Sequence, residues 1–328
     1  MARLFVTLQY LLPHHLLCRL AYALTRSRRP WLKNLLIRRF VQHYRPRMSD
    51  AIEPDALRYE SFNAFFTRAL RPGARALAGE PGRILCPCDG TVSLCGSIQA
   101  GRLMQAKGHD YSLEALLGGD RGWSERLADG QFATLYLAPY DYHRVHMPLA
   151  GRLRAAWHVP GRLFSVNTAT AARVPGLFAR NERVICAFEG EYGCFAVILV
   201  GALFVGSMST VWHGEITPWR AANRRAAHAR AAHGPALAGA AARTPWDVHP
   251  LDTPAADGML AAGSELGRFN MGSTVIVLLP AGSAHWDETL CRTGQSCRVG
   301  QALGAVTGAA ARTGGAAELL ALPGAGPA

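Results

Sequence analysis

The stretch RFNMGSTVIVLLP, residues 268–280, joins a Gly-Ser-Thr step directly to an apolar and largely β-branched run. Val, Ile and Thr favour strands, so the run predicts a buried strand that begins after a turn at Gly272-Ser273. A turn before a strand needs no reactive group, yet this one carries the hydroxyl of Ser273. Ser273 is therefore either an ordinary turn residue or a nucleophile, and other residues of the chain must decide between the two.

The residue composition and hydrophobic pattern of the chain change at about residue 83. From there on, short β-rich runs are separated by Gly, Pro, Asp and Asn, which is typical of a mainly antiparallel sheet. These runs are RILCPC, TVSLC, FATLYLA, RVICAFEG, FAVILVGALFVGSMSTVW and STVIVLLP. Before them, SFNAFFTRAL predicts a short helix that buries Phe62, Phe65 and Phe66. We expect an α+β fold, in which N-terminal amphipathic helices precede a mainly antiparallel β domain.

The N-terminal region is strongly basic. The 328-residue chain has a formal charge of +12, and residues 1–47 contain ten Lys or Arg and no Asp or Glu. Leucine recurs at every fourth position from Leu4 to Leu24, which predicts an amphipathic helix bent at Pro13, and residues 31–44 predict a second one. No stretch has the roughly 20 apolar residues that span a bilayer. The helices either pack on the core or lie in a membrane interface, and the absence of acidic residues favours an anionic membrane.

The cysteines, the low-complexity insertion and the C-terminal tail are not predicted to take part in catalysis or metal binding. The eight cysteines are scattered and follow no secretory signal, so we expect reduced thiols rather than disulfides. Cys86-x-Cys88 has no second pair at zinc-like spacing, and we predict no metal site. We expect the Ala/Arg-rich residues 221–243 to be a surface insertion, helical or disordered, and the Ala/Gly-rich residues 309–328 to be a flexible tail.

Three polar stretches are candidates for chemistry. Asp89-Gly90 lies between two apolar runs and predicts first of all a hairpin turn. In PYDYHRVHMP, His143 and His146 follow a predicted strand. They suit acid–base work, although a purely structural role for one or both fits the local sequence equally well. The polar SVN at 165–167 interrupts apolar flanks and forms either a pocket loop or an ordinary loop.

Ser273, His146 and Asp89 together supply a nucleophile, a base and an orienting carboxylate. A serine hydrolase of the familiar sandwiched-sheet kind carries Gly-x-Ser-x-Gly at a strand-to-helix turn, whereas Ser273 leads into a strand. An ordinary hydrolase that uses these three residues is therefore an alternative but not the favoured one. A non-enzymatic basic protein that binds membrane or nucleic acid is a second alternative, and the absence of a recognised nucleic-acid motif or aromatic platform weakens it.

Nine segments, in the same order along the chain, resemble bacterial phosphatidylserine decarboxylase proenzymes, which are membrane-associated pyruvoyl enzymes. The segments are LQYLLP, FNAFFTRALRP, CDGTVS, QAKGHDYSLEALLGG, DYHRVHMP, GRLFSVN, VPGLFARNERV, VGSMSTVWHGEITP and MGSTVIVL. The resemblance covers about residues 5–305. It departs at Met271, where the family usually has leucine, and in the insertion at residues 221–243.

The resemblance implies a self-processing decarboxylase. Ser273 would attack the carbonyl of Gly272, because a residue without Cβ permits unusual backbone angles and leaves that carbonyl open to approach. The resulting ester would break to leave a pyruvoyl group in place of Ser273. Asp89 and His146 would form the charge relay that activates Ser273. The pyruvoyl group would form a Schiff base with phosphatidylserine and release CO2 to give phosphatidylethanolamine, with His143 protonating the carbanion.

The resemblance also implies partners and a location. The residues expected to line the substrate site are Tyr136, Ser165, Val166 and Asn167. Residues 1–48 would bind an anionic membrane surface, which makes the enzyme peripheral on the cytoplasmic side of the inner cell membrane. Residues 49–308 would form the catalytic domain. The two cleavage fragments would stay together as a heterodimer, which could itself dimerise, and no nucleic-acid partner is expected.

Overall fold

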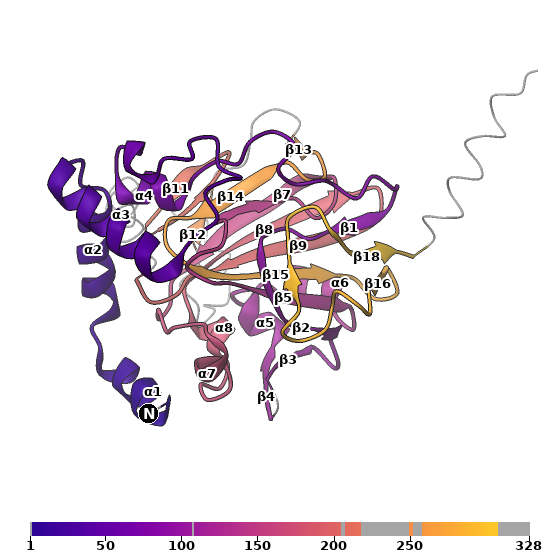
Figure 1. The fold of residues 1–328 in the computed structure, drawn as a ribbon. Helices are drawn as coiled ribbons and strands as arrows, with labels where there is room; N and C mark the ends of the chain where they lie inside the picture. The colour runs from indigo at the N-terminus through magenta and orange to yellow at the C-terminus, as the bar shows by residue number, and fades with distance from the viewer. Residues whose placement is uncertain (1, 107, 205–206, 218–248, 252–257, 308–328) are drawn as a thin grey trace, which may run out of the picture.

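The computed structural model describes residues 2–106, 108–204, 207–217, 249–251 and 258–307. The insertion expected at 221–243 and the tail expected at 309–328 lie outside these ranges. Helices gather at the N-terminal end, and β-sheets form the body of the protein (Figure 1). The α+β class predicted from the sequence is therefore confirmed.

The largest sheet has nine strands, and every pairing in it is antiparallel. Its order is β12-β7-β8-β9-β15-β5-β2-β17, and β13 also pairs with β7. The strands are β2 (Gly90–Ser97), β5 (Gln131–Leu137), β7 (Gly151–Val159), β8 (Arg183–Gly190), β9 (Gly193–Val200), β12 (His249–Pro250), β13 (Met259–Leu260), β15 (Ser273–Leu279) and β17 (Ser296–Cys297).

Three smaller sheets flank the large one. The four-stranded sheet has the order β11-β10-β14-β6, the three-stranded sheet β1-β18-β16, and the hairpin β3-β4. Their strands are β1 (Arg83–Leu85), β3 (Arg102–Ala106), β4 (His109–Ser112), β6 (Arg144–His146), β10 (Met208–Thr210), β11 (Gly214–Ile216), β14 (Glu265–Phe269), β16 (Ala284–Trp286) and β18 (Ala302–Val306).

The helices are short except for the first three. They are α1 (Ala2–Leu11), α2 (His14–Thr25), α3 (Pro30–Tyr44), the 3-10 turn η1 (Ala56–Arg58), α4 (Phe62–Phe66), α5 (Leu113–Leu116), α6 (Arg121–Leu127), α7 (Thr168–Ala171) and α8 (Leu177–Arg180). The predicted break at Pro13 is confirmed, because α1 ends before it and α2 begins after it. Within the described ranges, no helix has the length and apolar character to cross a bilayer.

Strand β15 lies at the centre of the large sheet, between β5 and β9, and all seven of its residues are buried. Val275, Val277 and Leu279 pack into the core on one face of the sheet. Ile276 and Leu278 pack into a second core on the other face. A strand covered on both faces needs an apolar residue at every position, which explains the continuous run seen in the sequence.

The Asp89-Gly90 pair does not form the expected hairpin turn. Strand β1, before it, pairs with β18, whereas β2, which begins at Gly90, pairs with β5 and β17 in a different sheet. Glycine is required at this position for another reason. A Cβ on Gly90 would lie 2.3 Å from the backbone oxygen of Tyr136, so only glycine lets β2 approach β5 this closely.

The N-terminal helices contact the sheet domain through residues other than their leucine stripe. Leu8, Leu16, Leu20 and Leu24 are all about half exposed. The buried side chains of α1 and α2 are instead small or polar, and they are Val6, Gln9, His14, Cys18 and Thr25. Helix α3 packs on α4, where Phe62, Phe65 and Phe66 are buried as predicted. The exposed leucines therefore leave an apolar strip on the helical end of the protein.

Burial of β15 on both faces predicts that trimming one of its side chains is costly. We expect Ile276→Ala to lower the free energy of unfolding by about 2–5 kcal/mol, because a fully buried isoleucine leaves a cavity. The same substitution at Ile52, which is 60% exposed, should change it by less than about 0.5 kcal/mol. Urea denaturation followed by circular dichroism measures both. Equal effects at the two positions would contradict the central placement of β15.

Candidate functional site

A cavity of about 200 Å³ opens at the start of β15. Its walls come from the end of β5, the loop before α7, the segment after β9, the C-terminus of α3 and α4. The lining residues are Tyr44, Phe66, Tyr136, Leu137, Pro139, Ser165, Val166, Ala202, Leu203, Phe204, Met271, Gly272 and Ser273. The structure thus brings Tyr136, Ser165 and Val166 together around the Gly272-Ser273 bond.

Asn167 does not line this cavity. Its side-chain oxygen accepts a hydrogen bond of 2.9 Å from the backbone N–H of Thr170, which caps the N-terminus of α7. Asn167 therefore stabilises the loop that carries Ser165 and Val166, although it does not line the cavity itself. The same loop is held by the N-terminal helices, since Gln9 accepts a 2.7 Å hydrogen bond from the N–H of Ser165.

Ser273 is the first residue of β15 and is only 1% exposed. Its backbone pairs with Leu137 of β5, which fixes the residue in place. Within the described part of the chain, its Oγ is buried and has no hydrogen-bond partner. Leaving a buried hydroxyl unpaired costs roughly 1–3 kcal/mol, so the arrangement favours a reactive role over a structural one.

Gly272 lies against a histidine. A Cβ placed on Gly272 would be 3.6 Å from Nε2 of His143 and 3.9 Å from the backbone oxygen of Leu137, both ordinary contact distances. The φ angle of Gly272 is not positive. The unusual backbone angles that glycine permits are therefore not adopted at this residue in this conformation. What the glycine provides here is open access beside the peptide bond.

His143 is buried, and its hydrogen bonds fix its tautomer. Its Nδ1 lies 2.9 Å from the backbone oxygen of Asp141, and because a carbonyl can only accept, Nδ1 carries the proton. Nε2 therefore holds a lone pair, and it has no partner among the described residues. Burial, and next the charge of Arg68, lower the pKa of His143 to about 3. The ring is a neutral base that faces Gly272 and packs at a tilt of 37° against Phe66, with centroids 4.0 Å apart.

Both ring nitrogens of His146 are engaged. Nδ1 donates to the backbone oxygen of Gly263 at 2.8 Å, and Nε2 accepts from the Tyr142 hydroxyl at 3.2 Å. Burial lowers the pKa of His146, so this ring is neutral as well. In this conformation the lone pair that would activate Ser273 is bound to Tyr142 instead.

Asp89 is oriented by an arginine. Arg75 donates to both oxygens of its carboxylate, from Nε and Nη2, and the N–H of Val299 also donates to Oδ1 at 3.0 Å. Arg75 also pairs with Asp50 at 2.9 Å. No hydrogen bond joins Asp89 to His146 in the described ranges, so the expected contact between the two is not formed here. Arg75 and Tyr142 carried no signal in the sequence that marked them as part of the site.

The arrangement brings a buried serine hydroxyl, a neutral imidazole and a shielded cavity together at one peptide bond. Within the described residues, no group of three His, Cys, Asp or Glu side chains is placed to hold a metal ion. The unpaired Ser273 hydroxyl and the adjoining cavity fit a pyruvoyl group formed at this position, because that group occupies the place of the serine itself.

Comparison with known proteins agrees with this chemistry. The family model described as phosphatidylserine decarboxylase matches residues 62–305, and a second, described as PSD, matches residues 4–45. The chain is 50% identical over 304 residues to the phosphatidylserine decarboxylase proenzyme of Pseudomonas putida strain F1, covering 93% of this chain and 98% of the relative. The proenzyme of Ectopseudomonas mendocina is 51% identical over 302 residues, covering 92% and 98%. That of Methylococcus capsulatus is 48% identical over 303 residues, covering 92% and 96%.

The buried neutral state of His143 predicts a pH dependence of stability. An unfolded histidine binds a proton below about pH 6.5, whereas folded His143 resists protonation down to about pH 3. The unfolded state therefore binds more protons in this window, and stability falls as the pH falls, by up to about 1.4 kcal/mol per pH unit. Replacing His143 by Gln should remove this component.

The measurement is the unfolding free energy of both proteins between pH 7.5 and 5, on a Ser273→Ala background that keeps the chain uncut. Comparing the two proteins matters because burial raises the pKa of Asp141 to about 6, which acts in the opposite direction in both. Parallel pH curves would show that His143 titrates normally.

Proposed function

Because this chain belongs to the phosphatidylserine decarboxylase family, it is a decarboxylase made as a proenzyme, and we propose how its own residues perform the two reactions. The first is self-cleavage between Gly272 and Ser273. The second is release of CO2 from phosphatidylserine to give phosphatidylethanolamine. The observation that carries the proposal is the buried Ser273 hydroxyl, unpaired in the described structure, at the head of the central strand.

In self-cleavage, Oγ of Ser273 adds to the carbonyl carbon of Gly272 and gives its proton to a base, and the peptide nitrogen takes a proton as its C–N bond breaks. The product is an ester that leaves a free amine on Ser273. A base then removes the Cα proton of Ser273, the ester C–O bond breaks, and Gly272 leaves as a carboxylate. Water replaces the nitrogen of the remaining dehydroalanine, which releases ammonia and leaves the pyruvoyl group.

Two histidines can serve as the base of self-cleavage. The family resemblance assigns this role to His146 with Asp89, and it requires Nε2 of His146 to exchange the Tyr142 hydroxyl for that of Ser273. His143 is a second candidate, favoured by its lone pair beside Gly272. Each is a neutral base, so neither has to lose a proton first.

In decarboxylation, the pyruvoyl group supplies the electron-accepting carbonyl. The chain's own residues exclude water, since Phe66, Val166 and Met271 line the cavity, and an apolar site favours loss of a charged carboxylate as neutral CO2. We propose that His143 supplies the proton needed after CO2 leaves, from Nε2, and its position beside Gly272 supports this role. To do so it must first take up a proton, which the negative charges of a bound substrate would favour by raising its pKa.

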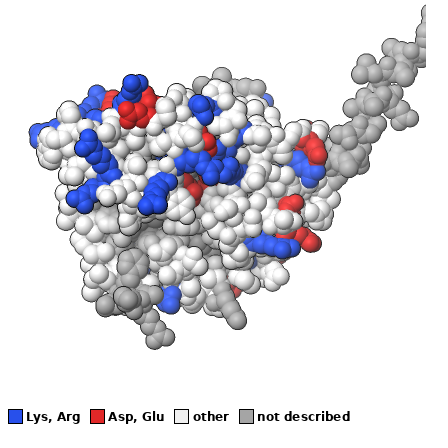
Figure 2. All heavy atoms as spheres, in the orientation of Figure 1, with Lys and Arg blue, Asp and Glu red and all other residues white. Residues whose placement is uncertain are grey.

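We further propose that fragments 1–272 and 273–328 stay paired as a heterodimer. Support comes from β15, which is hydrogen-bonded to strands of the larger fragment on both sides. The exposed leucines of α1 and α2, together with Arg and Lys groups on the face shown in Figure 2, support peripheral binding to an anionic membrane. That membrane would be the cytoplasmic side of the cell membrane.

Self-cleavage predicts two chains in the purified protein and one chain in Ser273→Ala. Removal of Oγ takes away the attacking atom, so the variant should remain uncut on a denaturing gel. Thr274→Ala is the matched control, because Thr274 has the adjacent buried hydroxyl, also unpaired in the described structure, and should still permit cleavage. An uncut wild-type protein that is folded and supplied with lipid would contradict the proposal, as would cleavage of Ser273→Ala.

The two histidines can be separated by substitution. We expect His143→Ala to lower CO2 release by about 100-fold or more, because loss of a positioned acid or base costs roughly 10²–10⁴ in rate. The exposed His285→Ala should have no effect. Slow cleavage in His146→Ala alone would assign the base of self-cleavage to His146, and slow cleavage in His143→Ala alone would assign it to His143. Normal CO2 release by cut His143→Ala would refute its role.

A further inference from the structure

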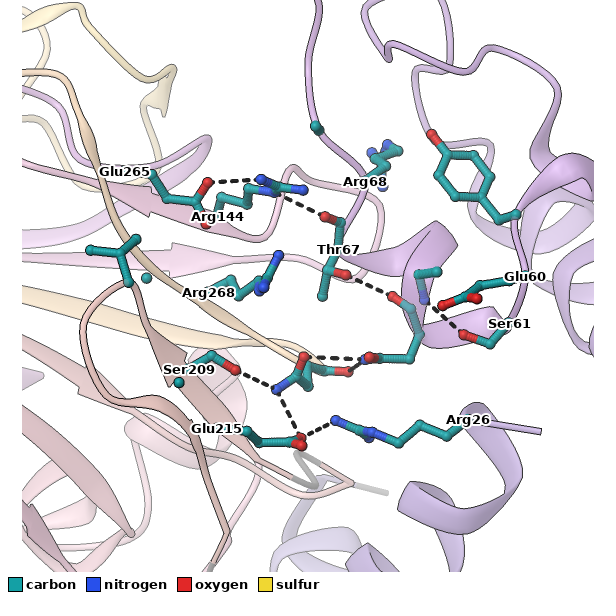
Figure 3. Close-up of a pocket in the computed structure, with 18 of the residues that line it drawn as sticks. Arg26, Glu60, Ser61, Thr67, Arg68, Arg144, Ser209, Glu215, Glu265 and Arg268 are labelled. Carbon is teal, nitrogen blue, oxygen red and sulfur yellow. Dashed lines mark hydrogen bonds and ion pairs between the residues drawn. The ribbon is translucent and has the colours of Figure 1, made fainter. Parts of the chain in front are cut away.

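A second and larger cavity, of about 720 Å³, lies beside α4. Helix α4 contributes to both cavities, since Phe66 lines the one at Ser273 whereas Asn63 and Ala64 line the larger one. The other walls come from the segment between α2 and α3 and from strands β6, β10 and β14 (Figure 3). None of its lining residues contacts Ser273 in the proposed decarboxylation, and only Arg68 acts on that reaction, through the effect of its charge on the pKa of His143.

The charges that line the cavity do not balance. It contains five arginines and four glutamates. Each glutamate already has an arginine partner, in the pairs Glu215–Arg26, Glu60–Arg28, Glu265–Arg144 and Glu53–Arg58. Two lining arginines, Arg68 and Arg268, remain without a carboxylate partner among the described residues.

Arg68 is only 3% exposed. Its Nη2 donates to the backbone oxygens of Tyr140 and Asp141 at 3.3 and 3.4 Å. Its Nε and Nη1 are buried and have no hydrogen-bond partner in the part of the chain that the structure describes. A buried cation with two unpaired donors is costly, so the structure calls for an anion at this position.

Arg268 lies on β14 directly opposite Arg144 of β6. Like charges opposite one another destabilise a sheet unless a counter-charge is present, and Glu265 neutralises only Arg144. Arg268 is half-buried, and none of the described residues forms a hydrogen bond or ion pair with its side chain. Figure 3 shows Arg268 between Arg144 and Ser209, with its guanidinium directed toward Thr67.

We propose that this cavity binds a phosphate group through Arg68 and Arg268. Guanidinium groups match phosphate oxygens with paired, charge-assisted hydrogen bonds, and the cavity is large enough for a substituted phosphate. The group can belong to free phosphate or to the headgroup of a phospholipid other than the one at Ser273. Both sources present negatively charged, non-bridging phosphate oxygens to the two arginines.

The cavity adjoins the cleavage site through the backbone. Arg268 is four residues before Gly272 on the same segment, and Asn63 of α4 donates a 2.9 Å hydrogen bond to the backbone oxygen of Asn270. An anion held by Arg68 and Arg268 would therefore join the segment that follows α4 to the strand that leads to Gly272. It would stabilise the walls of the smaller cavity.

The test is direct binding to full-length Ser273→Ala protein, which stays uncut and makes the result independent of catalysis. Inorganic phosphate is titrated by calorimetry at constant ionic strength, with chloride as the balancing anion. We expect saturable binding that Arg268→Gln weakens by about tenfold or more, as expected for loss of a charge-assisted hydrogen bond. Arg121→Gln is the matched control, because the side chain of Arg121 is 83% exposed and lines neither this cavity nor the one at Ser273.

A second titration with monomeric dihexanoyl phosphatidylglycerol identifies the source of the phosphate. If this lipid binds at least as tightly as inorganic phosphate and Arg268→Gln weakens it equally, the site takes a phospholipid headgroup. If only inorganic phosphate binds, the site takes the free ion. The proposal is overturned if neither ligand binds saturably, or if Arg268→Gln and Arg121→Gln bind phosphate as well as the parent protein. Arg268→Gln is used because Arg268 is half-buried, so the variant should fold; its thermal unfolding checks this.

Discussion

The burial of β15 on both faces of the sheet is the constraint on which the rest of the structure depends. Because β5 and β9 hold the strand from both sides, the position of Ser273 at its first residue is fixed by backbone pairing. A nucleophile needs such fixed geometry to reach a neighbouring carbonyl. The same pairing would keep the smaller fragment in place once the chain is cut, so one strand serves both assembly and chemistry.

Exclusion of water decides the acid–base character of the site. Both His143 and His146 are kept neutral mainly by desolvation, and each uses Nδ1–H to bind a backbone carbonyl. The two rings differ at Nε2. In His146 this nitrogen accepts a hydrogen bond from the Tyr142 hydroxyl, whereas in His143 it has no partner among the described residues. Two residues of one short motif, three positions apart, thus differ in the described structure by a single hydrogen bond at Nε2.

Periodicity and residue type were enough to predict the buried strand at 274–279, the break at Pro13 and the phenylalanine cluster on α4, because each depends on local pattern. They failed where distant segments meet. The leucine stripe predicted an amphipathic helix correctly, but the surface that packs on the sheet domain is made by Gln9, His14 and Cys18. Nor could spacing show that Arg75 holds Asp89, or that Asn167 caps a helix instead of lining the cavity. Family resemblance proposed the site residues, whereas their contacts could be described only from the fold.

The most direct test of the central claim, that Ser273 is converted into the pyruvoyl group, is the intact mass of the fragment that begins at position 273. The account predicts that this fragment is lighter than the serine-headed peptide by the mass of one ammonia, and that borohydride reduces its terminal carbonyl. A fragment with an ordinary N-terminal serine would contradict it, because hydrolysis of the ester would then have replaced elimination and no carbonyl would exist for decarboxylation.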